Sequence, residues 1–287
     1  MATAVPNEQT GVDNAGTGAC RRRGSQHDPT VLSRQPPPMD SALAASLPGL
    51  HQHWHYTLPW PDGTALSVQV LAFGRDDFAI EAFTQAGIAC PAAIARSVRK
   101  RQAEYFFGRL AARQAMRQQA LIDPAIAVQV GTGGAREPLW PPGIIGSISH
   151  TERLAAAAVV PAQSRRGIGI DLEHLVSPEA CDALLGTVVN TVELELLHAV
   201  QTSSRWTRDA LLTLVFSAKE SLFKASFAAV GRYFDFSAAQ LVQVQPAAGR
   251  LQLRLCETLC PQLPAGELCT IGFAWVDAQT VITYRLW

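Results

Sequence analysis

The segment between Thr207 and Gly231 restricts the fold most, because it predicts a long helix that is apolar on most of its sides. Thr207 suits the N-cap, and Gly231 suits the left-handed position that ends a helix. The apolar residues are Leu211, Leu212, Leu214, Val215, Phe216, Leu222, Phe223 and Phe227. Such a helix must be buried, so the charged Lys219, Glu220 and Lys224 on it need partners or a chemical task.

Short strands before and after this helix predict an α+β fold with small, largely antiparallel sheets. Trp54, Tyr56 and Leu58 alternate with polar residues before a Pro-Asp-Gly turn, which indicates a β-hairpin. We expect further strands near residues 126–130, 144–149, 154–160, 167–172, 241–244, 251–255, 271–276 and 281–286, and helices over 92–119, 178–185 and 191–200. Residues 1–40, rich in Gly, Pro, Ser, Thr and Gln, predict a disordered leader.

Composition limits the kinds of partner. The 24 basic and 24 acidic residues balance, so no overall field attracts nucleic acid or an anionic membrane. Six cysteines without CxxC spacing argue against a zinc site or a redox pair. The longest apolar run, 154–162, is too short to span a bilayer, and no apolar segment adjoins the arginines at 21–23. We therefore expect a cytoplasmic protein without nucleic-acid or membrane partners.

Two pairs of charged residues suggest a site. Asp171 and Glu173 are two apart on a strand, so both point to the same face. Their charges repel unless a cation lies between them, and Mg²⁺ with its oxygen ligands suits that place. Taken alone, this pattern is more typical of solvated carboxylates. Glu220 and Lys224, four apart on the apolar helix, are likewise typical of an ordinary helix ion pair.

The segment Gly-Ser-Ile-Ser-His-Thr at 146–151 ends a strand with small and polar residues. Small residues let a ligand approach the backbone, and Ser149 and His150 offer donors to a phosphate oxygen. A Ser-His hydrolase pair is disfavoured because neighbouring side chains on a strand point apart and the sequence has no Gly-x-Ser-x-Gly elbow.

The helix over 92–119 has one strongly basic face. It comprises Arg96, Arg99, Lys100, Arg101, Arg109, Arg113 and Arg117, against the single acidic Glu104. A solvated face and an anion-binding face explain this pattern equally well.

Together these stretches resemble the 4′-phosphopantetheinyl transferases of the larger, monomeric surfactin and enterobactin type, over about residues 95–236. The matching stretches are RQAEYFFGR at 101–109, REPLWP at 136–141, GSISH at 146–150, GIDLE at 169–173, and Lys219-Glu220 with Lys224. Many relatives have Trp where Phe216 stands, and the form Phe-Ser-Ala-Lys-Glu-Ser at 216–221 is more similar to the enterobactin branch.

The resemblance implies two similar α+β halves, 41–165 and 166–287, related by pseudo-two-fold symmetry, with coenzyme A in the cleft between them. It implies a monomeric enzyme that moves 4′-phosphopantetheine from coenzyme A to a serine of an apo acyl or peptidyl carrier protein and releases 3′,5′-ADP. It places Mg²⁺ on Asp171, Glu173 and Glu220. It places coenzyme A on Arg101, Arg109, Arg136, Ser149, His150, Asp171 and Lys224. The catalytic residues would be Lys224 and the general base Glu220.

Other classes of function stay open. A Mg²⁺-dependent nucleotide hydrolase or kinase would use the same carboxylates, but the Gly-rich stretch 131–134 lacks the Gly-Lys-Ser/Thr of a phosphate-binding loop. A non-catalytic carrier-binding module is disfavoured by the intact charged residues. A metal site on His51, His53 and His55 suits one strand face, although exposed histidines are usually solvated.

Overall fold

The computed structural model describes residues 47–123, 125–204 and 206–287, which form two main antiparallel sheets. The N-terminal sheet has the order β1-β2-β6-β5, with β1 at Leu50–Pro59, β2 at Ala65–Phe73, β5 at Ile144–His150 and β6 at Leu154–Pro161. The C-terminal sheet has the order β7-β11-β10-β9-β8, with β7 at Ile168–His174, β8 at Ala239–Gln245, β9 at Arg250–Leu255, β10 at Leu268–Asp277 and β11 at Thr280–Leu286. A short hairpin of β3 (Gly131–Thr132) and β4 (Pro138–Leu139) lies apart from both.

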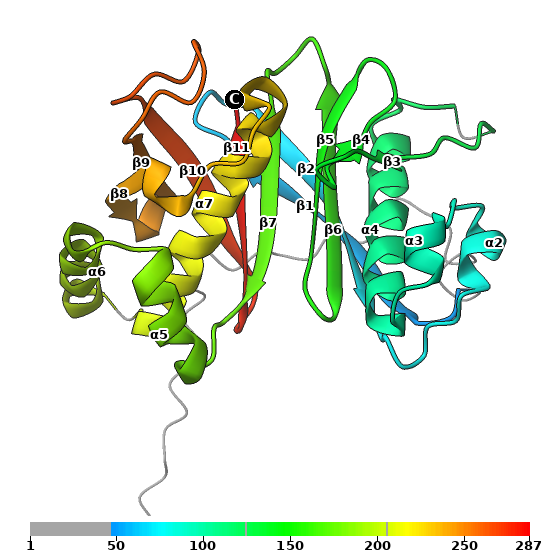
Figure 1. Ribbon diagram of the computed structural model, residues 1–287, viewed down its shortest axis with the longest axis horizontal. Helices are drawn as coiled ribbons and strands as arrows, with labels where there is room; N and C mark the ends of the chain where they lie inside the picture. Colours follow the sequence, from blue (N-terminus) through cyan, green and yellow to red (C-terminus); the bar gives the residue numbers. More distant parts are fainter. Residues whose placement is uncertain (1–46, 124, 205) are drawn as a thin grey trace, which may run out of the picture.

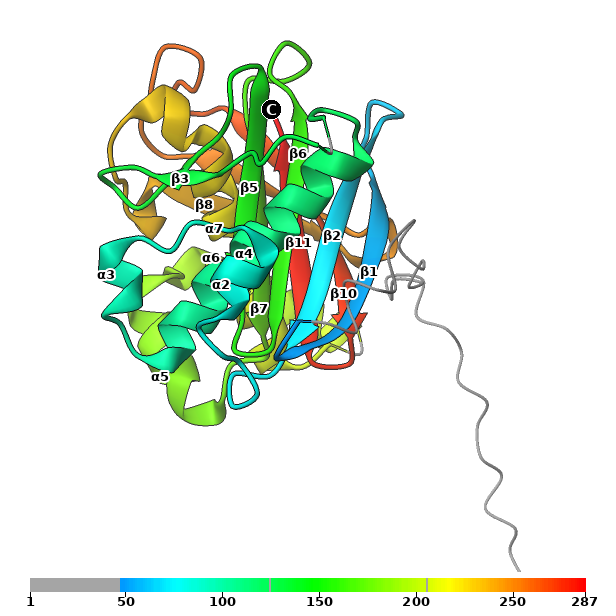
Figure 2. The same ribbon diagram turned by 90° about the vertical axis from the view of Figure 1, so that its right-hand side faces the viewer.

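One long helix covers the outer face of each sheet (Figures 1 and 2). Helix α4 (Arg99–Gln118) contacts β2, β5 and β6, and α7 (Arg208–Val230) contacts β7, β10 and β11. The shorter helices are α2 (Ala82–Ala86), α3 (Ala92–Ala95), α5 (Pro178–Thr187) and α6 (Thr191–Ser203), with 3₁₀ turns η1 (Phe236–Ala238) and η2 (Pro246–Ala248).

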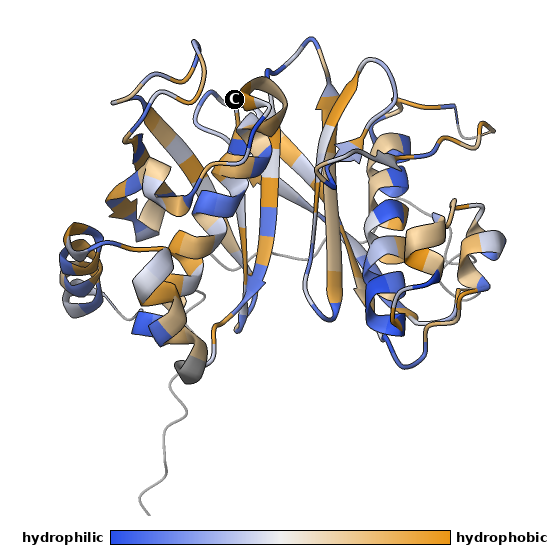
Figure 3. Ribbon diagram, in the orientation of Figure 1, coloured by the Kyte–Doolittle hydropathy of each residue, from blue (hydrophilic) through white to orange (hydrophobic). Residues whose placement is uncertain are grey.

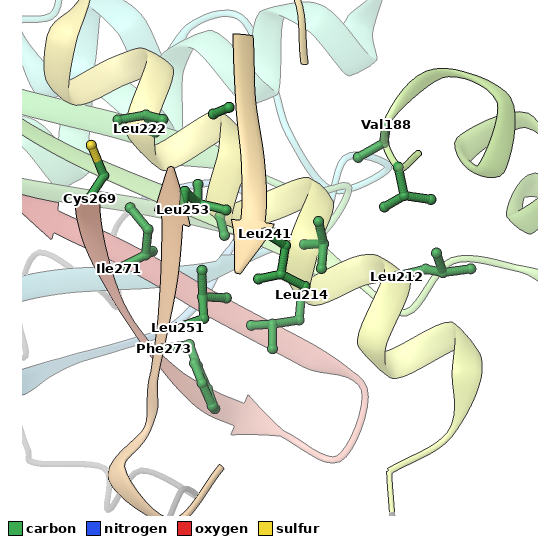
Figure 4. Packing of buried hydrophobic residues seen from close by; sticks show 14 of the residues in the cluster. Val188, Leu212, Leu214, Leu222, Leu241, Leu251, Leu253, Cys269, Ile271 and Phe273 are labelled. Carbon is green, nitrogen blue, oxygen red and sulfur yellow. The ribbon is translucent and has the colours of Figure 1, made fainter. Parts of the chain in front are cut away.

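Three apolar cores hold these layers together. The first lies between α7 and the C-terminal sheet, where Leu222, Leu253 and Ile271 point toward one another (Figure 4). The second lies under α4, which alternates hydrophilic and hydrophobic turns beside the mostly hydrophobic β6 (Figure 3). The third joins the two sheets, with Tyr56 of β1 and Ile282 of β11 among its members. Because this third core is continuous, the two sheets pack face to face.

Most predicted elements are confirmed. The predicted hairpin is β1 and β2, in a register that pairs Trp54 with Val70 and Tyr56 with Val68. The strands predicted from residue 144 onward correspond to β5 to β11, and α7 ends at Gly231, whose φ is +69°. The leader predicted over residues 1–40 lies outside the described residues.

Two predictions on the N-terminal side are wrong. The helix predicted over 92–119 is interrupted between α3 and α4, where Val98 is extended. The hydroxyl of Ser97 donates to the carbonyl of Ile94, and the Gln102 amide donates to the carbonyls of Ala95 and Ser97, so side chains take carbonyls that a continuous helix needs. The strand predicted near 126–130 is not formed. Pairing begins only at residue 131, next to a Val130 carbonyl that accepts from an arginine side chain.

No described helix is both long and apolar enough to cross a membrane.

Candidate functional site

Helix α7 lies unusually close to strand β7, and two glycines allow it. A Cβ atom at Gly167 would lie 1.9 Å from the carbonyl oxygen of Ala225, and one at Gly169 would lie 2.0 Å from that of Ser221. Any larger residue would force the helix away from the strand. The close approach brings the side chains of Glu220 and Lys224 on α7 to the carboxylates that β7 presents.

Serine hydroxyls join β7 to the neighbouring strand β5. The amide of Ile170 donates to Ser147 Oγ, and that of Leu172 donates to Ser149 Oγ, each at 3.0 Å. Both serines are buried. Alternate side chains of β5 therefore accept hydrogen bonds from the backbone amides of β7, as the carbonyls of a paired strand would. We call this edge, where the two sheets meet, the seam. Ser149 Oγ also donates to Asp171 Oδ1 at 3.0 Å, so the seam orients that carboxylate.

Lys224 completes a polar cluster at the seam. Its Nζ lies 2.5 Å from Asp171 Oδ1 and 3.2 Å from Ser149 Oγ. The Asp171 side chain is 3% exposed, whereas that of Lys224 is 26% exposed. The carboxylate is therefore fixed inside the protein, while the lysine amine still reaches solvent and could meet an incoming ligand.

The seam has three carboxyl groups, on Asp171, Glu173 and Glu220, and Lys224 pairs with only one of them, Asp171. The second oxygen of Asp171, Oδ2, is buried without a hydrogen-bond partner. Burial, together with the nearby charges of Asp171 and Glu220, raises the pKa of Glu173 to about 8. Burial also raises the pKa of Glu220, again with a contribution from Asp171. These three carboxyl groups thus lie within electrostatic range of one another and are poorly solvated.

An orphaned buried carboxylate oxygen among mutually repelling carboxyls fits a small divalent cation. Within the described residues, however, no three His, Cys, Asp or Glu side chains already form a metal-binding group. The residues therefore fit a cation by charge and donor type, with the Lys224 amine close to Asp171 Oδ1.

His150 extends the cluster toward α4. Its Nε2 lies 3.4 Å from Nη1 of Arg101. Burial, together with the positive charges of Arg101 and Lys224, lowers the pKa of His150 to about 4. The imidazole is thus neutral at neutral pH. Ser149, Asp171 and Lys224 thus contact one another, and the neighbouring residue His150 contacts Arg101. These five predicted site residues come from four elements of the fold.

Arg109 lies elsewhere. Its guanidinium donates to the carbonyls of Val130 and Gly131 at 2.8 Å and to Thr132 Oγ1 at 2.9 Å, and it stacks 4.5 Å from the Tyr105 ring centre. Burial lowers its pKa. Arg136, also a predicted site residue, is exposed at the tip of the β3–β4 hairpin with a left-handed φ of +67°.

The three histidines considered as a metal site do not form one among the described residues. His51 pairs with Asp77 at 3.0 Å, and His53 lies 2.7 Å from Gln69.

The sequence interpretation missed a buried ion pair on the other side of α7. Lys219 Nζ lies 2.8 Å from Glu193 Oε1, and both side chains are at most 3% exposed. Glu193 also forms the capping box that begins α6, since the Asn190 side chain accepts from its amide while its own carboxylate accepts from the Asn190 amide. The Asn-x-x-Glu spacing was the signal that could have placed Glu193.

A cavity of about 240 Å³ opens beside Glu220. Its lining includes four aromatic residues, Phe223, Tyr233, Phe234 and Phe236, and also the charged residues Lys219 and Asp235. A pocket with both aromatic and charged residues in its walls suits a ligand that is part apolar and part polar.

Two family models match the chain. They are the 4′-phosphopantetheinyl transferase N-terminal domain over residues 90–160 and the 4′-phosphopantetheinyl transferase superfamily over residues 167–268. Together they take up more than half of the chain. The chain belongs to the 4′-phosphopantetheinyl transferase superfamily.

Individual relatives agree with this assignment. The chain is 39% identical over 127 residues to enterobactin synthase component D of Salmonella typhimurium, which is 44% of this chain and 49% of that protein. It is 35% identical over 149 residues to 4′-phosphopantetheinyl transferase Npt of Nocardia iowensis, 52% of this chain and 62% of the relative. It is 36% identical over 163 residues to 4′-phosphopantetheinyl transferase Svp of Streptomyces mobaraensis, 56% of this chain and 62% of the relative. The matched stretch thus spans about half to three fifths of these relatives.

Proposed function

We propose that this protein transfers the 4′-phosphopantetheine group of coenzyme A to a serine hydroxyl of an apo acyl or peptidyl carrier protein, with release of 3′,5′-ADP. The main support is the seam, where Lys224 pairs with Asp171, one oxygen of which has no partner, and where His150 contacts Arg101 and lies within electrostatic range of Lys224. Phosphoryl transfer requires mainly that reactants be positioned and that charge on phosphate oxygens be neutralised, and this cluster suits both tasks. The names of two relatives, 4′-phosphopantetheinyl transferases Npt and Svp, support transfer of the same group.

We further propose that residues 41–165 and 166–287 form two similar halves related by pseudo-two-fold symmetry. One long helix packed on an antiparallel sheet in each half supports this idea. Coenzyme A would lie across the seam between the halves, and the protein would act as a cytoplasmic monomer.

Asp171, Glu173 and Glu220 would hold Mg²⁺, which when bound supplies positive charge to the diphosphate of coenzyme A. Lys224, His150 and Ser149 would contact the phosphates from the protein side. Of the two proposed ligands on α4, Arg101 and Arg109, Arg101 is better placed for the 3′-phosphate, because Arg109 already donates to the carbonyls of Val130 and Gly131. Arg136 would lie near the adenine nucleotide.

Glu220 is the proposed general base. In the reaction the serine oxygen of the carrier forms a bond to the β-phosphorus of coenzyme A, and the bond from that phosphorus to the 3′,5′-ADP oxygen breaks. Glu220, directly or through water, would take the serine proton. Its raised pKa makes it a stronger base than an exposed glutamate once it is ionised.

One assay tests this proposal and its alternatives. Purified protein is incubated with an apo carrier protein and labelled coenzyme A, with Mg²⁺ and then with a chelator. We expect covalent label on the carrier only with Mg²⁺, and none with Asp171→Ala. Hydrolysis of nucleotide without labelled carrier would favour the hydrolase or kinase instead, and carrier binding without any chemistry would favour the non-catalytic module.

A further inference from the structure

The tip of the β3–β4 hairpin, residues 133–137, is held in a strained shape. The amide of Arg136 donates to the carbonyl of Gly133 at 3.1 Å, and the amide of Gly133 donates to the carbonyl of Glu137 at 2.9 Å. This pattern is that of a hairpin loop whose last residue is left-handed, a position that glycine usually takes. Here it is Arg136, with φ +67°. Left-handed backbone at a long charged side chain costs free energy and points to a function.

The hairpin shape is also braced from within. The amide of Ala135 donates to Glu137 Oε2 at 2.9 Å. That carboxylate fills the space beside Gly133, where a Cβ atom would lie 2.0 Å from Glu137 Oε1. The tip is therefore a small ordered unit that presents Arg136 to solvent.

Contacts from α4 and from the segment after α7 hold the hairpin in place. On the N-terminal side, Arg109 donates to Gly131 and Thr132, and the Tyr105 hydroxyl lies 3.3 Å from Thr132 Oγ1. On the C-terminal side, the hydroxyl of Tyr233 donates to the carbonyl of Ala135 at 2.6 Å, across 98 positions of the chain. The hydrogen bond from Tyr233 to Ala135 joins the segment after α7 to the hairpin on the N-terminal side, so it fixes the hairpin tip relative to α7.

Tyr233 is itself positioned by α7. Its ring stacks on Phe223 at 5.4 Å with an interplanar angle of 20° and lies 5.7 Å from Phe227. Phe223 is the neighbour of Lys224, and Tyr233 lines the cavity beside Glu220. Tyr233 is nevertheless 64% exposed, so burial in an apolar core does not explain why a tyrosine stands at this position.

We propose that Tyr233 is a positioning residue. It holds the hairpin tip, and with it Arg136, at a fixed distance from Lys224, the residue of α7 that is proposed to contact phosphate. This inference rests on the proposed function, in which Arg136 lies near the nucleotide of coenzyme A. The Tyr233 hydroxyl is engaged by a backbone carbonyl and acts through Arg136. Its loss therefore weakens coenzyme A binding and leaves the chemical step unchanged.

The test compares Tyr233→Phe with the wild type in steady-state transfer to an apo carrier protein. The variant keeps the stacked ring and removes one hydrogen bond. We expect the KM for coenzyme A to rise about three- to tenfold, with kcat within about twofold of the wild type. Tyr105→Phe is the matched control, because it removes a longer and weaker hydroxyl contact to the same hairpin from the N-terminal side. Its KM should change by less than about twofold.

Hydrogen exchange gives a second readout that needs no activity. The amides of Gly133, Ala135 and Arg136 should exchange faster in Tyr233→Phe than in the wild type, at an unchanged midpoint of urea unfolding. An unchanged KM with unchanged exchange overturns the proposal, and so does an equal KM rise in Tyr105→Phe. If the wild type labels no carrier, the proposed function fails separately. The exchange comparison then still decides whether Tyr233 holds the tip.

Discussion

Helix α7 carries two lysine–carboxylate pairs that differ in how completely their atoms are bonded. Lys219 lies 2.8 Å from Glu193, and Lys224 lies 2.5 Å from Asp171. Both carboxylates are buried. The chemistry of the two pairs is the same, so the difference between them must come from their surroundings.

In the first pair, each oxygen of Glu193 has a partner. Oε1 accepts from Lys219 and from the amide of Leu241 at 2.6 Å, and Oε2 accepts from the amide of Asn190 at 2.8 Å. Lys219 also donates to the carbonyl of Val188 at 2.6 Å. This pair connects α7 to β8, to the start of α6 and to the residue that follows α5. Both carboxylate oxygens are already hydrogen-bonded, so neither is free to bind a ligand.

In the second pair, Asp171 Oδ2 has no hydrogen-bond partner, and burial and the charge of Asp171 raise the pKa of two further carboxyls, Glu173 and Glu220. Such an arrangement lowers stability unless something else binds. The comparison teaches that incomplete bonding, more than burial or pairing, marks which of two similar ion pairs is suited to function.

The largest expected effect is on the rate of transfer. Glu220→Gln should lower kcat by about 10²- to 10⁴-fold, because it removes the proposed general base. The free energy of unfolding should not fall, since the variant removes a buried carboxyl near Asp171. Label transfer and urea unfolding measure the two quantities. Near-normal kcat would remove Glu220 from the reaction.

Lys219→Met should show the opposite behaviour and destabilise the fold by about 3–5 kcal/mol, because it leaves the Glu193 carboxylate buried without its cation. The double variant Lys219→Met with Glu193→Gln should recover part of this loss, since it removes the buried charge while its single amide oxygen can accept from only one of the two backbone amides. Urea unfolding of the three proteins checks both statements. A cost below about 1 kcal/mol for Lys219→Met would mean that the two pairs do not differ as described.

Glu173→Gln should change how stability depends on pH. The Glu173 pKa of about 8, above its ordinary value of 4.5, means that the folded chain keeps this proton while the unfolded chain loses it. The wild type should therefore lose stability as the pH rises from 5 to 8, and the variant should lose less, by about 2 kcal/mol or more. Urea unfolding at both pH values measures the difference.

Mg²⁺ provides the control for that experiment. At pH 8 it should raise the unfolding midpoint of the wild type more than that of Glu173→Gln, because binding favours the ionised carboxyls. Equal shifts in both proteins would contradict a cation at this position.

A smaller effect is expected at His150. Its pKa of about 4, below the ordinary 6.5, means that the unfolded chain takes up this proton first as the pH falls. The wild type should lose stability between pH 6.5 and pH 4, and His150→Gln should lose less by about 1 kcal/mol. Matched urea titrations at pH 7 and pH 5 report the difference. A parallel loss in both proteins would place the histidine in a solvated setting.

The periodicity of the sequence predicted an element correctly where the apolar pattern of that element alone determines it. The alternation around Trp54 and Tyr56 predicted β1, and the apolar helix ended at Gly231 as expected. The prediction for residues 92–119 failed because Ser97 and Gln102 bond to backbone carbonyls and interrupt the helix. Side-chain competition of this kind depends on rotamers that a periodicity does not contain.

The sequence by itself determined that Asp171 and Glu173 share a strand face and that Glu220 and Lys224 share a helix face, because both facts follow from the repeat of one element. Only the tertiary structure decided that Lys224 reaches Asp171, which is 53 positions away, and that Arg109 donates to the carbonyls of Val130 and Gly131. The physical reason is that such contacts depend on how closely separate elements pack. Here the missing side chains of Gly167 and Gly169 set that distance.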